Sequence, residues 1–165
     1  VVHEENKGLS FARNTGMSLA KGECLAFIDG DDAVKANYIE TLVGNLIADG
    51  ADMSGVGRYE NVLGEDSFRY YSSVESKVTY SDYRDYIYDT YTDKEKRFFQ
   101  SAIVVWGKLF RKEVFEGIEF PVGRINEDSW IFPKIISGCH KITISPEPLY
   151  FYRKRKGSIR MPSMS

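Results

Sequence analysis

The distribution of apolar and polar positions along the first half of the chain predicts alternating strands and helices. An uninterrupted apolar run over Cys24–Ile28 lies between two glycines and predicts a short strand buried in a sheet. A helix is predicted after it, ending near Gly50, because apolar residues recur at helical spacing at Ile39, Leu42, Val43, Leu46 and Ile47. A strand followed by an amphipathic helix is the unit from which parallel sheets are built.

Another helix is predicted before the apolar run. Ser10 can cap a helix that extends to about Ala20, where Lys21-Gly22 would end it. We expect its small-residue face to pack closely on a sheet, and this face consists of Leu9, Ala12, Gly16 and Ala20. Residues 51–59 predict a further strand, and residues 67–73 predict its hairpin partner.

The order strand, helix, strand, helix, strand predicts an α/β fold with a mostly parallel sheet flanked by helices. Residues 80–99 have no clean period and predict one or two irregular helices. Asn126 is a good cap for a later helix, which Pro133 is expected to break, because an interior proline costs about 3 kcal/mol.

The end of the chain predicts two short closing strands, at residues 142–144 and 149–152, and then a basic segment. No convincing second-domain boundary is visible. We therefore predict one domain over residues 1–152, followed by a basic tail over residues 153–165.

Composition and charge exclude some classes of protein. The 165 residues carry a formal net charge of −2, which argues against nucleic acid as the main partner. Cys24 and Cys139 do not form a disulfide framework and indicate a reducing compartment. Because no segment reaches membrane-spanning length and no signal pattern opens the chain, we expect a cytoplasmic protein. The basic tail adds the expectation of peripheral association with the inner face of the membrane.

Three carboxylates follow the apolar run and form the first candidate site. Asp29, Asp31 and Asp32 would lie at the carboxyl end of a strand, where open α/β folds bind ligands. Such a cluster favours a divalent cation that carries substrate phosphates. An EF-hand loop fits poorly, because Ala33 and Val34 stand where a ligand and the turn glycine belong. An aspartyl phosphotransferase with Asp29 as nucleophile stays an open alternative.

Two more positions carry charges of interest at helix starts. Arg13 lies in a first turn, where a cation opposes the helix dipole, so an anionic ligand or plain solvation accounts for it equally well. Glu127 and Asp128 lie in the first turn after Asn126, where acids complement the dipole. Neighbouring helix positions point about 100° apart, so these two acids cannot serve one hydroxyl equally.

Several segments, in order, resemble the inverting family-2 glycosyltransferases with the GT-A fold. They are Asn6-Lys-Gly-Leu-Ser-Phe-Ala-Arg-Asn-Thr-Gly16, Ala20-Lys-Gly-Glu23, Phe27-Ile-Asp-Gly-Asp-Asp32, Trp106-Gly-Lys-Leu-Phe110, Asn126-Glu-Asp128 and the closing Tyr152-x-x-x-x-Gly-Ser-Ile159. The resemblance spans almost the whole chain, and the ordered combination is far more specific than any one segment.

The resemblance implies transfer of a sugar, with inversion, from a nucleotide-diphosphate donor, most simply a UDP-sugar. The family's Asp-x-Asp motif corresponds to Asp29 and Asp31, which implies a Mn²⁺ or Mg²⁺ on Asp31 with Asp29 nearby. Asp29 or Asp32 would contact the ribose or a metal-bound water. The general base is implied at Asp128, with Glu127 beside it, and a helix N-terminus tends to keep such a carboxylate ionised.

The resemblance also implies contacts with both substrates. Arg13 would contact the nucleotide base or the diphosphate, and Arg155 and Ser158 of the tail would close over the diphosphate. Trp106 would form part of the acceptor pocket, although a buried core position is slightly favoured for this tryptophan. The acceptor would be a saccharide or a lipid-linked saccharide, as in the synthesis of a bacterial surface polysaccharide.

One departure from the family pattern concerns the start of the chain. The family's first two strand–helix units, which carry much of the base recognition, are not found before Val1. We therefore expect weak or no donor binding and no turnover by these residues alone. An exposed sheet edge would favour a homodimer. A non-catalytic carbohydrate-binding or assembly module, derived from such an enzyme, is the alternative function.

Overall fold

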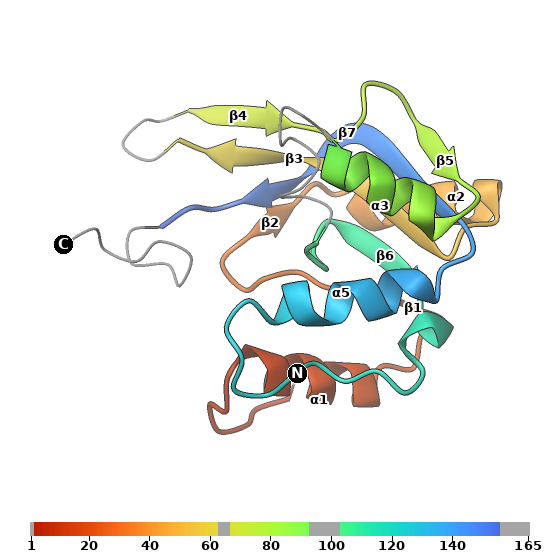
Figure 1. Cartoon of the computed structure of the whole chain (residues 1–165). Helices are drawn as coiled ribbons and strands as arrows, with labels where there is room; N and C mark the ends of the chain where they lie inside the picture. Colours follow the sequence, from red (N-terminus) through yellow and green to blue (C-terminus); the bar gives the residue numbers. More distant parts are fainter. Residues whose placement is uncertain (1, 63–66, 93–102, 156–165) are drawn as a thin grey trace.

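A mixed β-sheet forms the centre of the structure, with helices packed on both faces (Figure 1). The computed structural model describes residues 2–62, 67–92 and 103–155. The strands follow the order β1-β6-β3-β7-β2, with β4 paired to β3 and β5 paired to β7. Their bounds are β1 Cys24–Ala26, β2 Ala33–Val34, β3 Met53–Asn61, β4 Phe68–Tyr71, β5 Val78–Tyr80, β6 Lys108–Arg111 and β7 Ile142–Tyr152.

The α/β class is confirmed, but the expectation of a mostly parallel sheet is wrong. Among the described ladders β3 and β7 pair in parallel, whereas the pairs β1–β6, β3–β6, β3–β4, β2–β7 and β5–β7 are antiparallel. The strand–helix–strand order correctly implies that β1 and β3 run the same way, since both are antiparallel to β6. The order cannot reveal that β6, from much later in the chain, lies between them.

The helices divide between the two faces of the sheet. One face is covered by α2, and the other by α3 and α5, while α1 lies beside α5 (Figure 1). Their bounds, with the short 3-10 helix η1, are α1 Leu9–Leu19, α2 Tyr38–Asp49, α3 Tyr83–Thr92, η1 Lys112–Phe115 and α5 Glu127–Ser137. Part of the predicted irregular helical segment is thus confirmed as α3, and residues 93–99 lie outside the described residues.

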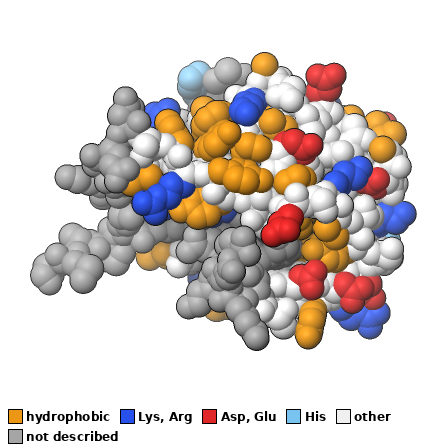
Figure 2. Space-filling model, turned by 90° about the horizontal axis from the view of Figure 1, so that it is seen from above, with side chains coloured by type: hydrophobic (Ala, Val, Ile, Leu, Met, Phe, Trp, Pro, Cys, Tyr) orange, Lys and Arg blue, Asp and Glu red, His pale blue; other side chains and the backbone are white. Residues whose placement is uncertain are grey.

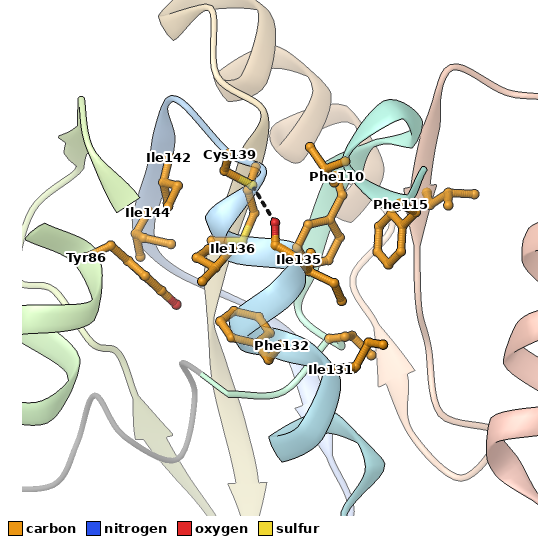
Figure 3. Packing of buried hydrophobic residues seen from close by; sticks show 14 of the residues in the cluster. Tyr86, Phe110, Phe115, Ile131, Phe132, Ile135, Ile136, Cys139, Ile142 and Ile144 are labelled. Carbon is orange, nitrogen blue, oxygen red and sulfur yellow. Dashed lines mark hydrogen bonds between the residues drawn. The ribbon is translucent and has the colours of Figure 1, made fainter. Parts of the chain in front are cut away.

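The alternation of side chains along β6 separates the two cores. Leu109 packs with α2 on one face, and Phe110 packs with α5 on the other, as the two-residue period of a strand requires. Figure 3 shows the second core, where α5 directs apolar side chains toward the strands and α3. These side chains belong to Ile131, Phe132, Ile135 and Ile136.

The predicted break of α5 at Pro133 does not occur. The helix continues through the proline to Ser137, although Pro133 cannot donate a hydrogen bond to the preceding turn. Phe132 and Ile135 on either side of it are 1% and 0% exposed. Burial of these side chains offsets the cost of the proline, which the local sequence alone cannot reveal.

The predicted helix 39–47 is confirmed as α2, but its apolar stripe is narrower than expected. Leu42 and Leu46 are buried, together with Tyr38, whereas Ile39 and Ile47 are 46% and 68% exposed. The helix ends as predicted at Gly50, which adopts a left-handed conformation with φ 58°.

The predicted hairpin is confirmed as β3 and β4, and the two predicted closing strands are one strand, β7. The register between β3 and β7 shifts on both sides of Gly57. A Cβ atom at Gly57 would lie 2.5 Å from the carbonyl oxygen of Pro146. This close approach of the two backbones requires glycine in β3, and the register shift there accommodates the prolines of β7.

Two expectations for the N-terminal segment are wrong. The helix α1 begins at Leu9 with Gly8 as its N-cap, and Ser10 is buried within it rather than capping it. Its predicted packing face is exposed at Leu9, Ala12 and Gly16, while Ser10 and Arg13 point inward. The inward face contains Arg13 because acidic side chains from other elements neutralise its charge, as described below.

The strand β1 is not buried on both faces as predicted. Leu25 is 8% exposed, but Ala26 and Ile28 are exposed. The strand ends the path of the sheet, so one of its edges has no partner strand among the described residues. The homodimer expected through an exposed edge stays a prediction.

The surface shows hydrophobic side chains gathered next to charged ones on the face seen from above Figure 1 (Figure 2). Large exposed apolar side chains include those of Phe68, Tyr70, Tyr88 and Tyr91.

Within the described ranges, no helix has the length and apolar character needed to cross a membrane.

Candidate active site

The predicted acidic turn, Asp29–Asp32, follows β1 and is fastened to the end of β7. The Tyr150 hydroxyl accepts a hydrogen bond from the Asp29 backbone N–H at 3.2 Å and donates one to Asp32 Oδ2 at 2.7 Å. The Arg153 backbone N–H donates to Asp32 Oδ1 at 2.8 Å. Both carboxylate oxygens of Asp32 are therefore engaged, which gives this residue a role in holding the turn.

Arg13 connects this turn with the start of α5. Its Nη1 donates to Glu127 Oε1 at 2.5 Å and to Asp128 Oδ1 at 2.7 Å, and its Nη2 donates to Asp29 Oδ1 at 3.1 Å. The guanidinium also lies 5.2 Å from the centre of the Phe120 ring. We call Arg13, Asp29, Glu127 and Asp128 the Arg13 cluster. It brings together four of the predicted site residues.

The local sequence explains how α1 and α5 meet in this way. The Asn14 side chain accepts a hydrogen bond from the Phe120 N–H at 2.7 Å and donates one to the Phe120 carbonyl at 2.9 Å. This pair of bonds ties α1 to the loop that precedes α5. Asn126 occupies the N-cap of α5 in a left-handed conformation, with φ 56°, but its side chain does not cap the helix as predicted.

Burial is the largest influence on the ionisation of Asp128. The pKa of Asp128 is raised to about 6, mainly by burial; Arg13 opposes this rise, and the charges of Glu127 and Asp29 contribute to it. The expectation that the helix N-terminus sets the state of this carboxyl is therefore incomplete, because burial outweighs it. A carboxyl with this pKa is still mostly ionised at neutral pH. Burial opposes the charge of Arg13, but the surrounding carboxylates raise the pKa of Arg13 overall.

Asp29 and Asp31 have the chemistry of ligands for a hard cation. Their side chains are 26% and 33% exposed and offer only oxygen atoms. Magnesium commonly uses one or two carboxylates and takes its other oxygens from water and substrate phosphates. In the described part of the chain, no three His, Cys, Asp or Glu side chains are grouped to hold an ion by themselves. The two carboxylates fit a cation that arrives with phosphates, and the Mn²⁺ or Mg²⁺ site stays a prediction.

The tail residue Arg155 lies against the acidic turn, as its predicted role requires. Its Nη2 contacts Asp31 Oδ2 at 2.5 Å, and its side chain is 62% exposed. Such an exposed ion pair contributes little to stability. Ser158 lies outside the described residues.

Trp106 is buried against the C-terminal end of β7. It is 5% exposed and stacks with both Tyr150 and Tyr152, whose ring centres are 4.9 and 5.2 Å away. This position favours the core role over the acceptor-binding role, which stays a prediction.

Two residues beside the site were not singled out from the sequence. Tyr150 appeared as one residue of a closing strand, and nothing local marks its hydroxyl as a partner of the acidic turn. Lys108 lies within the Trp106–Phe110 motif and is 4% exposed, with its Nζ donating to the Val104 carbonyl at 2.8 Å. Burial lowers the pKa of Lys108 to about 7, and Asp128 opposes this shift. The signal in the sequence that could have singled out Lys108 is a lysine within an otherwise apolar segment.

Comparison with known proteins gives a consistent result. Residues 1–118 match the family model described as glycosyl transferase family 2. The chain is 32% identical to glycosyltransferase GlyA and 33% identical to glycosyltransferase GlyG, both of Streptococcus pneumoniae serotype 4. Each alignment covers 96% of this chain, but it spans 23% of GlyA and 53% of GlyG. The chain thus corresponds to about a quarter to a half of these relatives.

Solved structures show the same fold. The crystal structure of S. aureus TarS residues 1–349 in complex with UDP-GlcNAc matches 95% of this chain and 42% of its own, with a TM-score of 0.69 and 19% identity. At this identity the likeness concerns the fold, which is of the GT-A type. The family match argues against the alternative of an aspartyl phosphotransferase. From its family model and its relatives, this chain belongs to glycosyl transferase family 2.

Proposed function

We propose that the chain provides the catalytic site of an inverting glycosyltransferase that uses a nucleotide-diphosphate sugar, with UDP as the expected nucleotide. The acceptor is a saccharide or a glycolipid, in the synthesis of a bacterial surface polysaccharide. The observation that carries this proposal is the Arg13 guanidinium, which holds Asp128 and Asp29 at 2.7 and 3.1 Å. The base and the acidic turn therefore belong to one site. TarS, which has the same fold, was crystallised with UDP-GlcNAc, and this supports the donor class.

Asp128 acts as the general base in this proposal. With a pKa of about 6, it is ionised at neutral pH and can still accept a proton. The acceptor hydroxyl gives its proton to the Asp128 carboxylate, and its oxygen forms a bond to the anomeric carbon. The bond from that carbon to the diphosphate oxygen breaks on the opposite side, so the configuration inverts and the nucleoside diphosphate leaves.

The acidic turn serves the leaving diphosphate. Asp31 and Asp29 would hold the cation, which when bound offsets the charge of the diphosphate. Arg155, which pairs with Asp31 in this structure, supplies a further positive charge at the same place. Asp32 keeps the turn on Tyr150 and Arg153, so its contribution to donor binding is the shape of the turn.

The base is tested by Asp128→Asn in the natural protein that contains this chain. Sugar transfer should fall by about 10²–10⁴-fold, the usual contribution of a general base, while donor binding is retained. Glu40→Gln, at an exposed acid in the first turn of α2, is the matched control and should transfer normally. Transfer by Asp128→Asn at the rate of the control would overturn the assignment.

The acidic turn is tested separately by calorimetry with Mn²⁺ and UDP, on the same natural protein as the test of the base. Asp31→Ala should remove most of the binding heat, whereas Asp128→Asn should keep it. Equal heats from wild type and Asp31→Ala would sink the proposed role of Asp31. Binding without any transfer by the wild type would favour the non-catalytic alternative.

A further inference from the structure

A pocket adjoins the acidic turn through Ala33 and Arg153. It has a volume of about 330 Å³ and lies where β2, the β3–β4 hairpin and the end of β7 meet. Its lining includes Phe68, Phe151, Asn61, Ser67 and Arg153. We call it the aromatic pocket. Of the predicted site residues that the structure describes, none lies in its lining.

The pocket has a fixed aromatic wall and an exposed one. Phe151 stacks on Tyr59 with ring centres 5.3 Å apart, which holds its orientation. Phe68 stands nearly perpendicular to Phe151, at 6.0 Å, and is 56% exposed. A large apolar side chain that stays this exposed beside a pocket indicates a binding surface more than a core.

The polar groups of the pocket lie around these rings. Asn61 is bound through its amide to the backbone N–H and carbonyl of Lys154, at 2.5 and 3.1 Å, and so fixes the segment after β7. The exposed side chain of Arg153 also lines the pocket, as does Ser67. The lining therefore combines aromatic side chains with polar and charged ones.

The aromatic pocket is structurally continuous with the candidate active site. Ala33, in its lining, directly follows Asp32, and the Arg153 N–H donates to Asp32 Oδ1. The same turn presents Asp29 to the Arg13 cluster. One short turn thus separates the pocket from the residues that we assign to the donor and the base.

Saccharides match this lining. A pyranose ring has a flat face of C–H groups that packs on aromatic rings, and a rim of hydroxyls that bond to polar side chains. The volume is at the lower end of the range for small-molecule sites, and suits about one or two sugar units. We propose that the aromatic pocket binds a sugar unit of the acceptor that is distant from the reacting hydroxyl. This inference rests on the proposed function and makes the acceptor a saccharide of more than one unit.

The test is an NMR titration of the protein with the neutral disaccharides cellobiose, lactose and N,N′-diacetylchitobiose. At least one should shift the signals of Phe68 and Phe151, with a dissociation constant in the millimolar range or below. Phe68→Ala should weaken this binding about tenfold or more, which corresponds to about 1.4 kcal/mol. Phe68→Trp, which keeps an aromatic face, should retain it.

Controls separate this inference from the proposed function. Tyr88→Ala removes an aromatic side chain that is 68% exposed on α3, outside the pocket lining, and should bind the disaccharide as wild type does. Phe68→Ala should keep the Mn²⁺–UDP heat, which reports the acidic turn. No shift with any of the disaccharides, equal affinity of Phe68→Ala and wild type, or shifts of the pocket caused by UDP alone would each overturn the proposal.

Discussion

The helices α1 and α2 have similar lengths but bury opposite kinds of side chain. On α2 the inward residues are Tyr38, Leu42 and Leu46, whose exposed fractions are 0%, 0% and 2%. On α1 the inward residues are Ser10 and Arg13, at 5% and 8%. The apolar stripe of α2 packs on the sheet, whereas the inward face of α1 meets the carboxylates of α5 and the acidic turn.

The difference shows which interactions can be recognised locally. Burial of apolar area stabilises wherever it occurs, so an amphipathic stripe already indicates its own orientation. A buried guanidinium stabilises only if partners neutralise it, and those of Arg13 include Glu127 and Asp128, more than a hundred positions away. A helix that violates the hydrophobic pattern in this way marks the site.

The largest effect on stability is expected from Arg13→Ala. It leaves the acids of the Arg13 cluster buried without their cation and should lower the free energy of unfolding by about 3–5 kcal/mol at neutral pH. The loss should shrink under mildly acidic conditions, because Asp128, whose pKa is raised to about 6, can then take up a proton in the folded state. Urea unfolding at both pH values measures this. Arg13→Lys keeps the positive charge but not the forked guanidinium. Its free energy of unfolding should therefore lie between those of the wild type and Arg13→Ala. A pH-independent loss would contradict the account.

On the α2 side, Leu46→Ala should lower the free energy of unfolding by about 2–5 kcal/mol, the range for a buried leucine. Here the loss should be the same at acidic and neutral pH, because no titrating group is involved. The same urea series measures it. A loss that depends on pH as strongly as that of Arg13→Ala would remove the contrast between the two helices.

Glu127→Gln should change the ionisation of Asp128 more than the free energy of unfolding. Glu127 is one of the groups that raise the pKa of Asp128, so the variant should lower that pKa. The loss of transfer activity on acidification should then begin at a lower pH than in wild type, since the base stays ionised longer. Glu116→Gln, at an exposed acid near η1, is the control and should leave the pH profile unchanged. A shift of the profile toward higher pH would show that the sign is wrong.

The smallest effect is expected from Ile47→Ser on the exposed side of α2. Ile47 is 68% exposed, so its replacement should change the free energy of unfolding by no more than about 0.5 kcal/mol. Chemical denaturation measures this as well. A loss as large as that of Leu46→Ala would mean that the outer face of α2 is covered.

The sequence predicted the elements that carry their own signal. The amphipathic stripe and Gly50 define α2, the strand patterns of residues 51–59 and 67–73 indicate the hairpin of β3 and β4, and the ordered motifs indicate the GT-A fold. It did not predict the antiparallel insertion of β6 or the continuation of α5 through Pro133, because both depend on packing partners distant in the sequence. For the same reason the sequence suggests an anionic ligand for Arg13 but does not reveal its carboxylate partners. Nor does it mark Tyr150 as the residue that fastens the acidic turn.

The most direct test of the central claim, that Arg13 holds a buried, ionisable Asp128 beside the acidic turn, is an NMR titration of the Asp128 carboxyl. The account predicts a pKa of about 6 in the wild type. In Arg13→Gln this pKa should rise further, because the neighbouring positive charge that favours ionisation is gone. A pKa near the ordinary value of about 3.9 in the wild type, unchanged in Arg13→Gln, would contradict it.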